Sequence, residues 1–444
     1  MPPSTREPSE TPTPPAPATP PATSAPRQRL AWLDALRGIA ALAVVFDHLS
    51  YQVLVPVRNV VTAWIDPGEY GVFVFFLVSG FIVPASLERR GSVRSFWVSR
   101  VFRLYPLYLL ALVLLGLLTV LHLGTLRGMA QAPGTSALGQ LLMLSDVLST
   151  PDVPYTVWTL SYEMAFYLLI TLLFTLGLHR RSGLFALVFA AAALGVGGRL
   201  PASSALSASF LGTGPVALLA DLLILGGVAA AVVWRGSPRM FGAALAALTG
   251  LALITFNGSS QHYPWEAFTI LALMFAGTVL YRAEQGQLHR WLAAAITAAV
   301  LVLTLFGGLW HLHAAGDSLV LERKWVITLT LTALTFAAGL GLRRRTVPAF
   351  LAWLGLVSYS VYLLHPVLLG VYWHVSWSHQ DHSIPVQLVV TAAFLAVLLG
   401  SCWMTYRWVE APAQRLGKKV ATRLESRFGP DHPAQTPLSA GAPT

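Results

Sequence analysis

The sequence has very little cysteine and very little charge. Cys402 is the single cysteine in 444 residues, which excludes a disulfide within the chain, and no CxxC motif or Cys/His cluster indicates a structural metal site. Only 11% of the residues are charged, whereas 55% are hydrophobic and the mean hydropathy is +0.64. A chain of this length with so little charge cannot cover a soluble globule with polar surface. The composition therefore predicts an integral membrane protein.

Both ends of the sequence lack apolar runs. The first 26 residues contain ten prolines among Ser, Thr and Ala, so residues 1–28 are predicted to form a disordered cytoplasmic tail. Because the first apolar segment begins only after residue 30, we do not expect a cleavable signal peptide. Residues 413–444 are polar and are expected to be a disordered cytoplasmic tail beyond an interfacial turn or two. Residues 29–412 are then predicted to form the membrane domain.

The sequence between these tails contains about twelve apolar segments of the roughly 17–25 residues that cross a ~30 Å hydrocarbon core. The segments lie at residues 31–55, 70–87, 104–124, 157–178, 182–200, 212–234, 239–256, 265–281, 291–311, 325–342, 348–370 and 387–409. Two of them, 182–200 and 239–256, are rich in Ala and Gly, which favours helix contact over lipid exposure. Asp221 lies inside the sixth segment and has no assigned role. We predict an all-α polytopic membrane bundle of about 10–12 transmembrane helices.

The distribution of Lys and Arg predicts the orientation of this bundle. With a cytoplasmic N-terminus, the inside loops hold fourteen arginines, whereas the outside loops hold five basic residues. By the positive-inside rule, both termini are therefore expected in the cytoplasm, an N-in/C-in topology. Because the basic residues lie in short clusters between apolar runs, the net charge of +10 reflects topology and does not indicate nucleic-acid binding.

Ionisable side chains in the first apolar segment need an explanation. Arg37, Asp47 and His48 lie in an otherwise apolar helix, where each costs roughly 2.5–3.5 kcal/mol to insert. Arg37 and His48 are eleven positions apart, so they share one helix face with a rise of about 16 Å between them. Functional residues of this kind face a bundle interior or a water-filled cavity. The alternative is an Arg that snorkels to the interface and a His that a neighbouring helix satisfies.

A second polar feature follows the segment at 70–87. Residues 88–106 mix basic and aromatic side chains, and Arg100 and Arg103 fall three apart on one helix face. Two such arginines hold a phosphate or pyrophosphate with forked hydrogen bonds that Lys does not form. A cytoplasmic anchor with an aromatic belt is the alternative interpretation of the same residues.

Six motifs occur in an order that resembles a known family. They are LDALRGIAA at 33–41 leading to His48, GVFVFFLVSGF at 71–81, SFWVSRVFRLYP at 95–106, WTLSYEMAFY at 158–167, LVSYSVYLLHP at 356–366 and YRWVEAP at 406–412. With these motifs the chain resembles the bacterial membrane O-acyltransferases called acyltransferase family 3, over about residues 30–415. That family moves acyl groups, often acetyl, from coenzyme A to hydroxyls of cell-surface sugars, lipids or secondary metabolites.

The resemblance assigns roles to the polar residues. Arg37 and His48 fit the family's Arg-x10-His pair, and Arg100 and Arg103 fit its Arg-x-x-Arg motif. His48 is then expected to act as the general base near the acceptor hydroxyl, because imidazole titrates in the useful range. Arg100 and Arg103 are expected to bind the phosphates of coenzyme A. Arg37 is expected to bind the donor or to hold the helices in register.

Two further residues are candidates to orient the imidazole of His48. Glu163 and His365 fall at a comparable depth in their spans, and a carboxylate is the usual partner of a catalytic imidazole. Asp47 is a poorer candidate, because adjacent helical residues point about 100° apart. Ser79 lacks the GxSxG context of a nucleophile and is interpreted as a small packing residue.

The resemblance implies an O-acyltransferase that uses acyl-CoA, with acetyl-CoA as the first expectation, as a co-substrate. The implied acceptor is a hydroxyl of a carbohydrate, a lipid-linked glycan or a secondary metabolite, and the implied location is the bacterial plasma membrane. No permanently bound cofactor, metal or nucleic acid is expected. A secondary transporter is the alternative, because about twelve spans with a few buried charges also suit one. It predicts similar halves, whereas the charged motifs cluster in the first 170 residues without a counterpart after residue 220.

Overall fold

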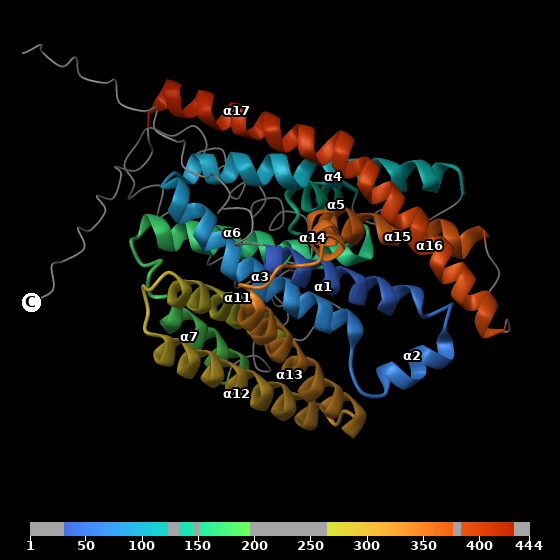
Figure 1. Ribbon diagram of the computed structural model, residues 1–444, viewed down its shortest axis with the longest axis horizontal. Helices are drawn as coiled ribbons and strands as arrows, with labels where there is room; N and C mark the ends of the chain where they lie inside the picture. The colour runs from blue at the N-terminus through green and yellow to red at the C-terminus, as the bar shows by residue number, and fades with distance from the viewer. Residues whose placement is uncertain (1–30, 123–132, 146–150, 196–263, 376–382, 430–444) are drawn as a thin grey trace, which may run out of the picture.

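The computed structural model describes residues 31–122, 133–145, 151–195, 264–375 and 383–429 (Figure 1). Nearly all of these residues are helical, and none of them forms a strand. Seven of the described helices are long and apolar enough to cross a membrane, or eight when one bent pair counts as a single span. The predicted class, an all-α polytopic membrane protein, is confirmed. The predicted spans 212–234 and 239–256, together with Asp221, lie outside the described residues.

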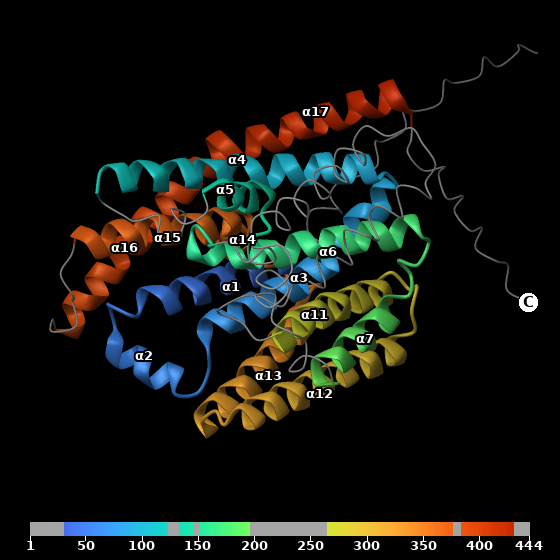
Figure 2. The same cartoon turned by 180° about the vertical axis from the view of Figure 1, so that it is seen from behind.

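The described helices form three groups, which Figures 1 and 2 show from opposite sides. The central group contains α1 (Ala31–Leu49), α3 (Pro67–Arg90), α6 (Trp158–Thr175) and α11 (Pro264–Glu284). On one side lie α4 (Val93–Val120), α15 (Ser358–Val375), α16 (Ile384–Thr405) and α17 (Ala411–Phe428). On the opposite side lie α7 (Ser182–Gly195), α12 (Arg290–Ala315) and α13 (Leu319–Leu342). The short elements are α2 (Val55–Thr62), α5 (Pro133–Leu142), η2 (Tyr155–Val157), α14 (Ala349–Leu356) and the π-helical turn η4 (Tyr406–Glu410).

Glycines let α3 and α11 approach to backbone contact. A Cβ on Gly80 would lie 1.8 Å from the carbonyl oxygen of Met274, and one on Gly277 would lie 2.3 Å from that of Leu77. Small residues are typical of such contacts, because membrane helices associate through close packing rather than through a hydrophobic driving force. The glycines therefore fix α3 against α11 along the part of α3 that carries the candidate site.

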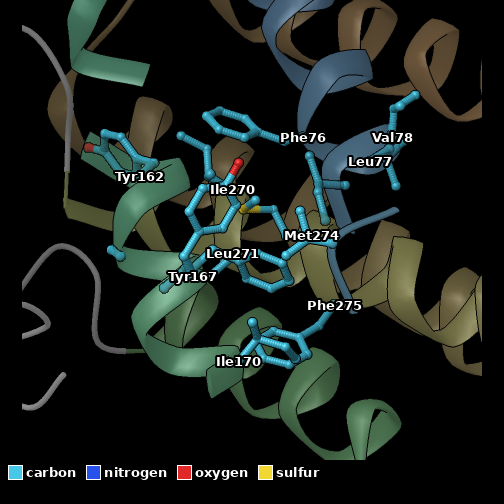
Figure 3. Close-up of a cluster of buried hydrophobic side chains, with 14 of the residues drawn as sticks. Phe76, Leu77, Val78, Tyr162, Tyr167, Ile170, Ile270, Leu271, Met274 and Phe275 are labelled. Atoms are coloured by element: carbon cyan, nitrogen blue, oxygen red, sulfur yellow. The ribbon is translucent and has the colours of Figure 1, made fainter. Parts of the chain in front are cut away.

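The buried side chains of α3, α6 and α11 meet in one core (Figure 3). Phe76 of α3 packs edge-on against Tyr162 of α6, with ring centroids 6.3 Å apart. Phe166 of α6 packs against Phe275 of α11, with ring centroids 5.3 Å apart. Such aromatic pairs contribute roughly 0.5–1.5 kcal/mol beyond the area that they bury. This core holds α3 and α6 in fixed relative positions, and both helices carry residues of the candidate site.

The predicted span 348–370 is divided in two. Helices α14 and α15 are bent by 66° where Val357 separates them. At this bend the chain presses against α1, since a Cβ on Gly355 would lie 1.9 Å from the carbonyl oxygen of Asp34. Glycine at this position therefore allows the end of α14 to lie against the backbone of α1. The bend brings the start of α15 to the cavities described below.

Helix α1 ends earlier than predicted. The first segment is predicted to extend to residue 55, whereas α1 ends at Leu49 and the chain turns at Leu54, whose φ is 61°. Leu54 is the left-handed N-cap of α2 and Pro56 lies in the first turn of that helix, so the chain begins a new helix here instead of extending α1 to residue 55. As a result, His48 lies in the last turn of α1, beside the loop.

The C-terminal segment is more ordered than predicted. Residues from 413 onward are predicted to be disordered, whereas α17 runs to Phe428 and lies along α4 in both views (Figures 1 and 2). A Cβ on Gly417 would lie 2.5 Å from Cβ of Phe102, so the two helices touch closely. The hydroxyl of Ser95 also donates to the carboxylate of Glu425. Packing against α4 therefore orders a helix whose polar composition suggests a free tail.

The positive-inside rule predicts which helix ends face the cytoplasm. In a Cys402→Ser background, a cysteine at exposed Ser426 of α17 is expected to resist an impermeant thiol reagent in intact cells. A cysteine at Ala315, exposed at the end of α12, is expected to be labelled. Labelling is measured as a mass shift before and after permeabilisation. Labelling of position 426 from outside, with position 315 protected, would overturn the N-in/C-in topology.

Candidate active site

Two cavities lie side by side in the described bundle. The first, which we call the arginine cavity, encloses about 670 Å³ of empty space, part of it open to solvent, and is lined by the three arginines of the predicted donor site. The second, which we call the histidine cavity, encloses about 860 Å³ of empty space, also partly open to solvent, and is lined by His48. Val72 and Tyr362 line both cavities. The two cavities therefore adjoin at these two residues.

The arginine cavity carries a surplus of positive charge. Arg37 comes from α1, and Arg100 and Arg103 lie about one turn apart on α4, as their spacing predicts. Glu163 is the only carboxylate among the described residues that line this cavity. Arg37 and Arg103 form no hydrogen bond or ion pair with another described residue, and their charges repel each other. Such a cavity suits an anionic ligand.

Arg100 is the most enclosed of the three arginines. Its side chain is only 5% exposed, and its guanidinium lies 4.9 Å from the ring centre of Tyr167 and 5.1 Å from that of Phe96. One Nη atom donates to the hydroxyl of Tyr167 at 3.5 Å, whereas Nε has no partner among the described residues. A buried donor without an acceptor is costly, at about 1–3 kcal/mol. A bound anion would supply the missing acceptor.

Glu163 belongs to the arginine cavity and not to the histidine cavity. Its carboxylate accepts hydrogen bonds from the hydroxyls of Tyr167 and, at 3.3 Å, of Ser79. Ser79 thus has a polar partner in the cavity, beyond the packing role expected from its sequence context. Of the two residues expected as candidates to orient His48, the structure therefore places His365, and not Glu163, beside the imidazole.

His48 and His365 form a stacked pair. Nδ1 of His48 lies 3.2 Å from Nε2 of His365, and the two rings lie 5.2 Å apart with their planes inclined by 28°. His365 is fully buried on α15, whereas His48 is partly accessible at the end of α1. The side of the His48 ring is also covered by Tyr155, whose ring centroid lies 5.0 Å away. The imidazole of His48 is therefore held on two sides.

Hydrogen bonding assigns a tautomer to each imidazole of the pair. Nδ1 of His365 lies 2.9 Å from the carbonyl oxygen of Val361, which only accepts, so this nitrogen carries the proton. Nε2 of neutral His365 is then an acceptor, and Nδ1 of His48 donates to it. Nε2 of His48 retains a lone pair. This is the protonation state that a general base requires.

Asp47 forms no hydrogen bond or ion pair with the imidazole of His48, although the two residues are adjacent in the chain. Its carboxylate forms an ion pair with Arg58 at 3.0 Å, and the same Arg58 atom donates to the backbone carbonyl of Asp47 at 2.7 Å. Arg58 in turn lies over the ring of Tyr51 at 3.5 Å. These contacts agree with the expectation that Asp47 is a poor partner for the imidazole.

The histidine cavity also carries carboxylates that no sequence motif marks. Asp66, Glu69 and Glu266 line it together with Asp47, and no Lys or Arg is found among its described lining residues. Each of the three lies at the start of α3 or α11, where an acidic residue is ordinarily explained by capping or by the helix dipole. The informative signal is that both helices begin at the same cavity. No three of these groups are close enough to hold a metal ion in the described part of the chain.

A family model described as an acyltransferase domain matches residues 30–406. The chain belongs to acyltransferase family 3. This assignment agrees with the motifs of the sequence, and the matched range includes both cavities. In this family 3 acyltransferase, the motifs at 95–106 and 158–167 supply residues of the arginine cavity. The motifs that contain His48 and His365 meet beside the histidine cavity.

Similarity of this family 3 acyltransferase to individual proteins covers shorter stretches. It is 35% identical over 148 residues to "Acyltransferase MdmB" of Streptomyces mycarofaciens, which covers 32% of this chain and 38% of that protein. It is 32% identical over 95 residues to "Putative O-acetyltransferase SACOL0978" of Staphylococcus aureus (strain COL), which covers 20% of this chain and 14% of that protein. It is 26% identical over 169 residues to "Putative peptidoglycan O-acetyltransferase YrhL" of Bacillus subtilis (strain 168), which covers 33% of this chain and 24% of that protein.

These matches each span less than two thirds of the relative's length, and no solved structure matches the chain. Family membership therefore rests on the match across residues 30–406 and not on any one relative. The arrangement itself offers a cationic cavity and, next to it, an imidazole with a free lone pair. A cationic cavity suits an anionic ligand, and a neutral imidazole with a free lone pair can accept a proton.

Proposed function

We propose that this protein is a membrane O-acyltransferase that moves an acyl group from acyl-CoA to a hydroxyl. Acetyl is the acyl group that we expect first. The observation that carries the proposal is the adjacency of the two cavities, with three arginines in one and His48 in the other. This adjacency supports the proposal, because a donor whose phosphates bind the arginines would have its thioester close to a proton-accepting base. The chain is expected to act in the bacterial plasma membrane, with the arginine cavity reached from the cytoplasm.

The arginine cavity is proposed to bind the anionic part of the donor. Arg37 and Arg103 form no hydrogen bond or close ion pair with a described residue, although Asp34 and Glu410 attract both at longer range. The Nε of Arg100 is a buried donor without an acceptor among the described residues. Phosphate oxygens accept forked hydrogen bonds from guanidinium groups, which an ammonium group does not reproduce. Glu163 sits among these arginines and is proposed to hold Tyr167 and, through it, Arg100 in place.

The transfer step is proposed to use His48 as the base. The acceptor oxygen attacks the thioester carbonyl carbon and forms the ester C–O bond, while Nε2 of His48 takes the hydroxyl proton. The C–S bond then breaks, and the leaving thiolate takes that proton from the imidazolium and departs as the thiol of coenzyme A. No other reactant is needed. His365 is proposed to keep His48 in the required tautomer through its hydrogen bond to Nδ1.

The acceptor is proposed to enter the histidine cavity. That cavity is lined by carboxylates and, among its described lining residues, by no Lys or Arg. It therefore suits neutral or cationic acceptors better than phosphorylated ones. A carbohydrate, a lipid-linked glycan or a secondary metabolite meets this condition at a neutral hydroxyl. One relative bears the name of a peptidoglycan O-acetyltransferase, which makes soluble peptidoglycan fragments a reasonable first acceptor to test.

The proposal is tested with the purified full chain in detergent and radiolabelled acetyl-CoA. Free thiol and label on the acceptor are expected to appear together, in equal amounts, when soluble peptidoglycan fragments or an extract of surface glycans is added. A secondary transporter would instead accumulate a solute in proteoliposomes without consuming acetyl-CoA. Failure of the wild-type chain to bind coenzyme A would reject the proposed donor site.

Replacing the arginines tests the donor site directly. Arg103→Ala and Arg100→Ala are each expected to weaken acetyl-CoA binding about 10–100-fold, because a hydrogen bond to a charged group contributes about 1.5–3 kcal/mol. Lys at either position is expected to restore part of the loss, since it keeps the charge without the fork. The measurement is the Kd of acetyl-CoA for the detergent-purified chain, beside its thermal unfolding.

The matched control for these variants is Arg345→Ala. Arg345 is exposed after α13 and lines neither cavity, so its loss removes one positive charge without altering the site. Its Kd for acetyl-CoA is expected to stay within about twofold of the wild-type value, as for a surface substitution. If Arg100→Ala and Arg103→Ala match this control, the two arginines serve membrane topology only.

A further inference from the structure

We propose that Val72 sets the length of the acyl group that the enzyme accepts, because it forms the boundary between the arginine cavity and the histidine cavity. The inference rests on the proposed function, since it requires the donor in one cavity and the acceptor hydroxyl in the other. Its structural basis is that Val72 and Tyr362 line both cavities. Both side chains are otherwise buried, at 6% and 7% exposure.

The chemistry requires the acyl group to lie at this boundary. The thioester carbonyl must come within reach of an oxygen that His48 activates from the histidine cavity, while the phosphates remain with the arginines. Beside the boundary, the wall of the arginine cavity is apolar and is formed by Phe75, Phe76 and Leu160. An acyl chain therefore finds an apolar surface there, and Val72 limits the room for its additional methylene groups.

The α3 side of the boundary cannot easily move away. A Cβ on Gly71, the residue next to Val72, would lie 2.5 Å from the carbonyl oxygen of Ala40 and 2.7 Å from a methyl group of Val44. The backbones of α1 and α3 thus touch at the level of Val72. Since packed helices deform little, the space beside Val72 depends on the size of its own side chain.

The Tyr362 side of the boundary is fixed by hydrogen bonds. Its hydroxyl lies 2.7 Å from the hydroxyl of Thr159 and 2.6 Å from the carbonyl oxygen of Thr156, to which it donates. Its ring packs edge-on against Phe75, with centroids 6.0 Å apart. A ring held through both its hydroxyl and its packing gives a rigid wall at the boundary that Val72 also lines. A rigid passage selects by size, whereas a mobile one would adapt.

The test compares the Kd values of acetyl-CoA, butyryl-CoA and hexanoyl-CoA for the detergent-purified full chain. Val72→Ala removes two methyl groups and is expected to raise the affinity for butyryl-CoA, relative to that for acetyl-CoA, at least about tenfold. This is the scale on which an apolar pocket distinguishes ligands that differ by one methylene. Val72→Ile adds a methylene and is expected to shift the same ratio in the opposite direction. The ratio is independent of the identity of the acceptor.

The matched control is Val74→Ala in the same helix. Val74 is fully buried but lines neither cavity, so its loss costs stability without changing the ratio. If folded Val72→Ala and Val72→Ile both keep the wild-type ratio of butyryl-CoA to acetyl-CoA affinity, the inference is overturned while the donor site remains in place. Absence of binding of coenzyme A itself to the wild-type chain would instead reject the proposed function on which the inference rests.

Discussion

Replacing His48 by Gln is expected to lower kcat about 10²–10⁴-fold, the range that a positioned general base contributes. Gln forms hydrogen bonds but cannot take up a proton at neutral pH, so it preserves contacts and removes the chemistry. His48→Ala is expected to be no more active than His48→Gln. The donor KM is expected to change little, because the arginine cavity does not include His48 among its lining residues. The measurement is the release of coenzyme A thiol with acceptor present.

His313→Gln provides the matched control for this substitution. His313 lies near the end of α12 with its side chain 83% exposed, pairs with Glu322 and lines neither cavity. Its turnover is expected to remain at the wild-type level. Expression and thermal unfolding of each variant separate loss of chemistry from loss of fold. A folded His48→Gln protein with near-normal turnover would make His48 a structural contact and leave the base unidentified.

The sequence predicts the residues of the site better than it predicts their pairing. Arg100 and Arg103 meet in one cavity because a spacing of three places both on one face of α4, whatever the neighbouring helices are. Arg37 and His48 share a helix face for the same reason, yet they line different cavities. Spacing within one helix fixes the relative direction of two side chains, and this does not depend on which helices pack around it. Which helices become neighbours depends on packing between residues far apart in the chain.

The partner of His48 shows where that local reasoning ends. Glu163 and His365 occur at similar depths, so depth alone does not distinguish them. The distinction comes with the bend between α14 and α15, after which α15 places His365 beside His48 at the end of α1. A hydropathy plot treats this segment as one uninterrupted span. The carboxylates at the starts of α3 and α11 carry no sequence signal for a related reason. Each one is an ordinary helix-start residue, and only the fold brings both helix starts to one cavity.

Removal of His365 is expected to slow turnover without affecting donor binding. His365→Ala deletes the acceptor of the Nδ1–H of His48, so the imidazole loses one of the bonds that orient it, and its contacts with Val44 and Tyr155 remain. Loss of such a supporting partner typically costs 10–100-fold, and we expect a decrease of about that size in kcat with an unchanged donor KM. His365→Gln is expected to recover part of the activity, because its amide oxygen accepts the same hydrogen bond.

A merely structural role for His365 predicts a different pattern. His311 supplies the comparison, since it bonds the carbonyl oxygen of Ala193 at 2.9 Å, stacks on Trp265 and lines neither cavity. His311→Ala is expected to lower the unfolding temperature with kcat retained. In a His48→Gln background, His365→Ala is expected to cause no further loss, because the two residues act as a unit. Equal activities of His365→Gln and His365→Ala, or additive losses in the double variant, would show that His365 supports the fold and does not position the base.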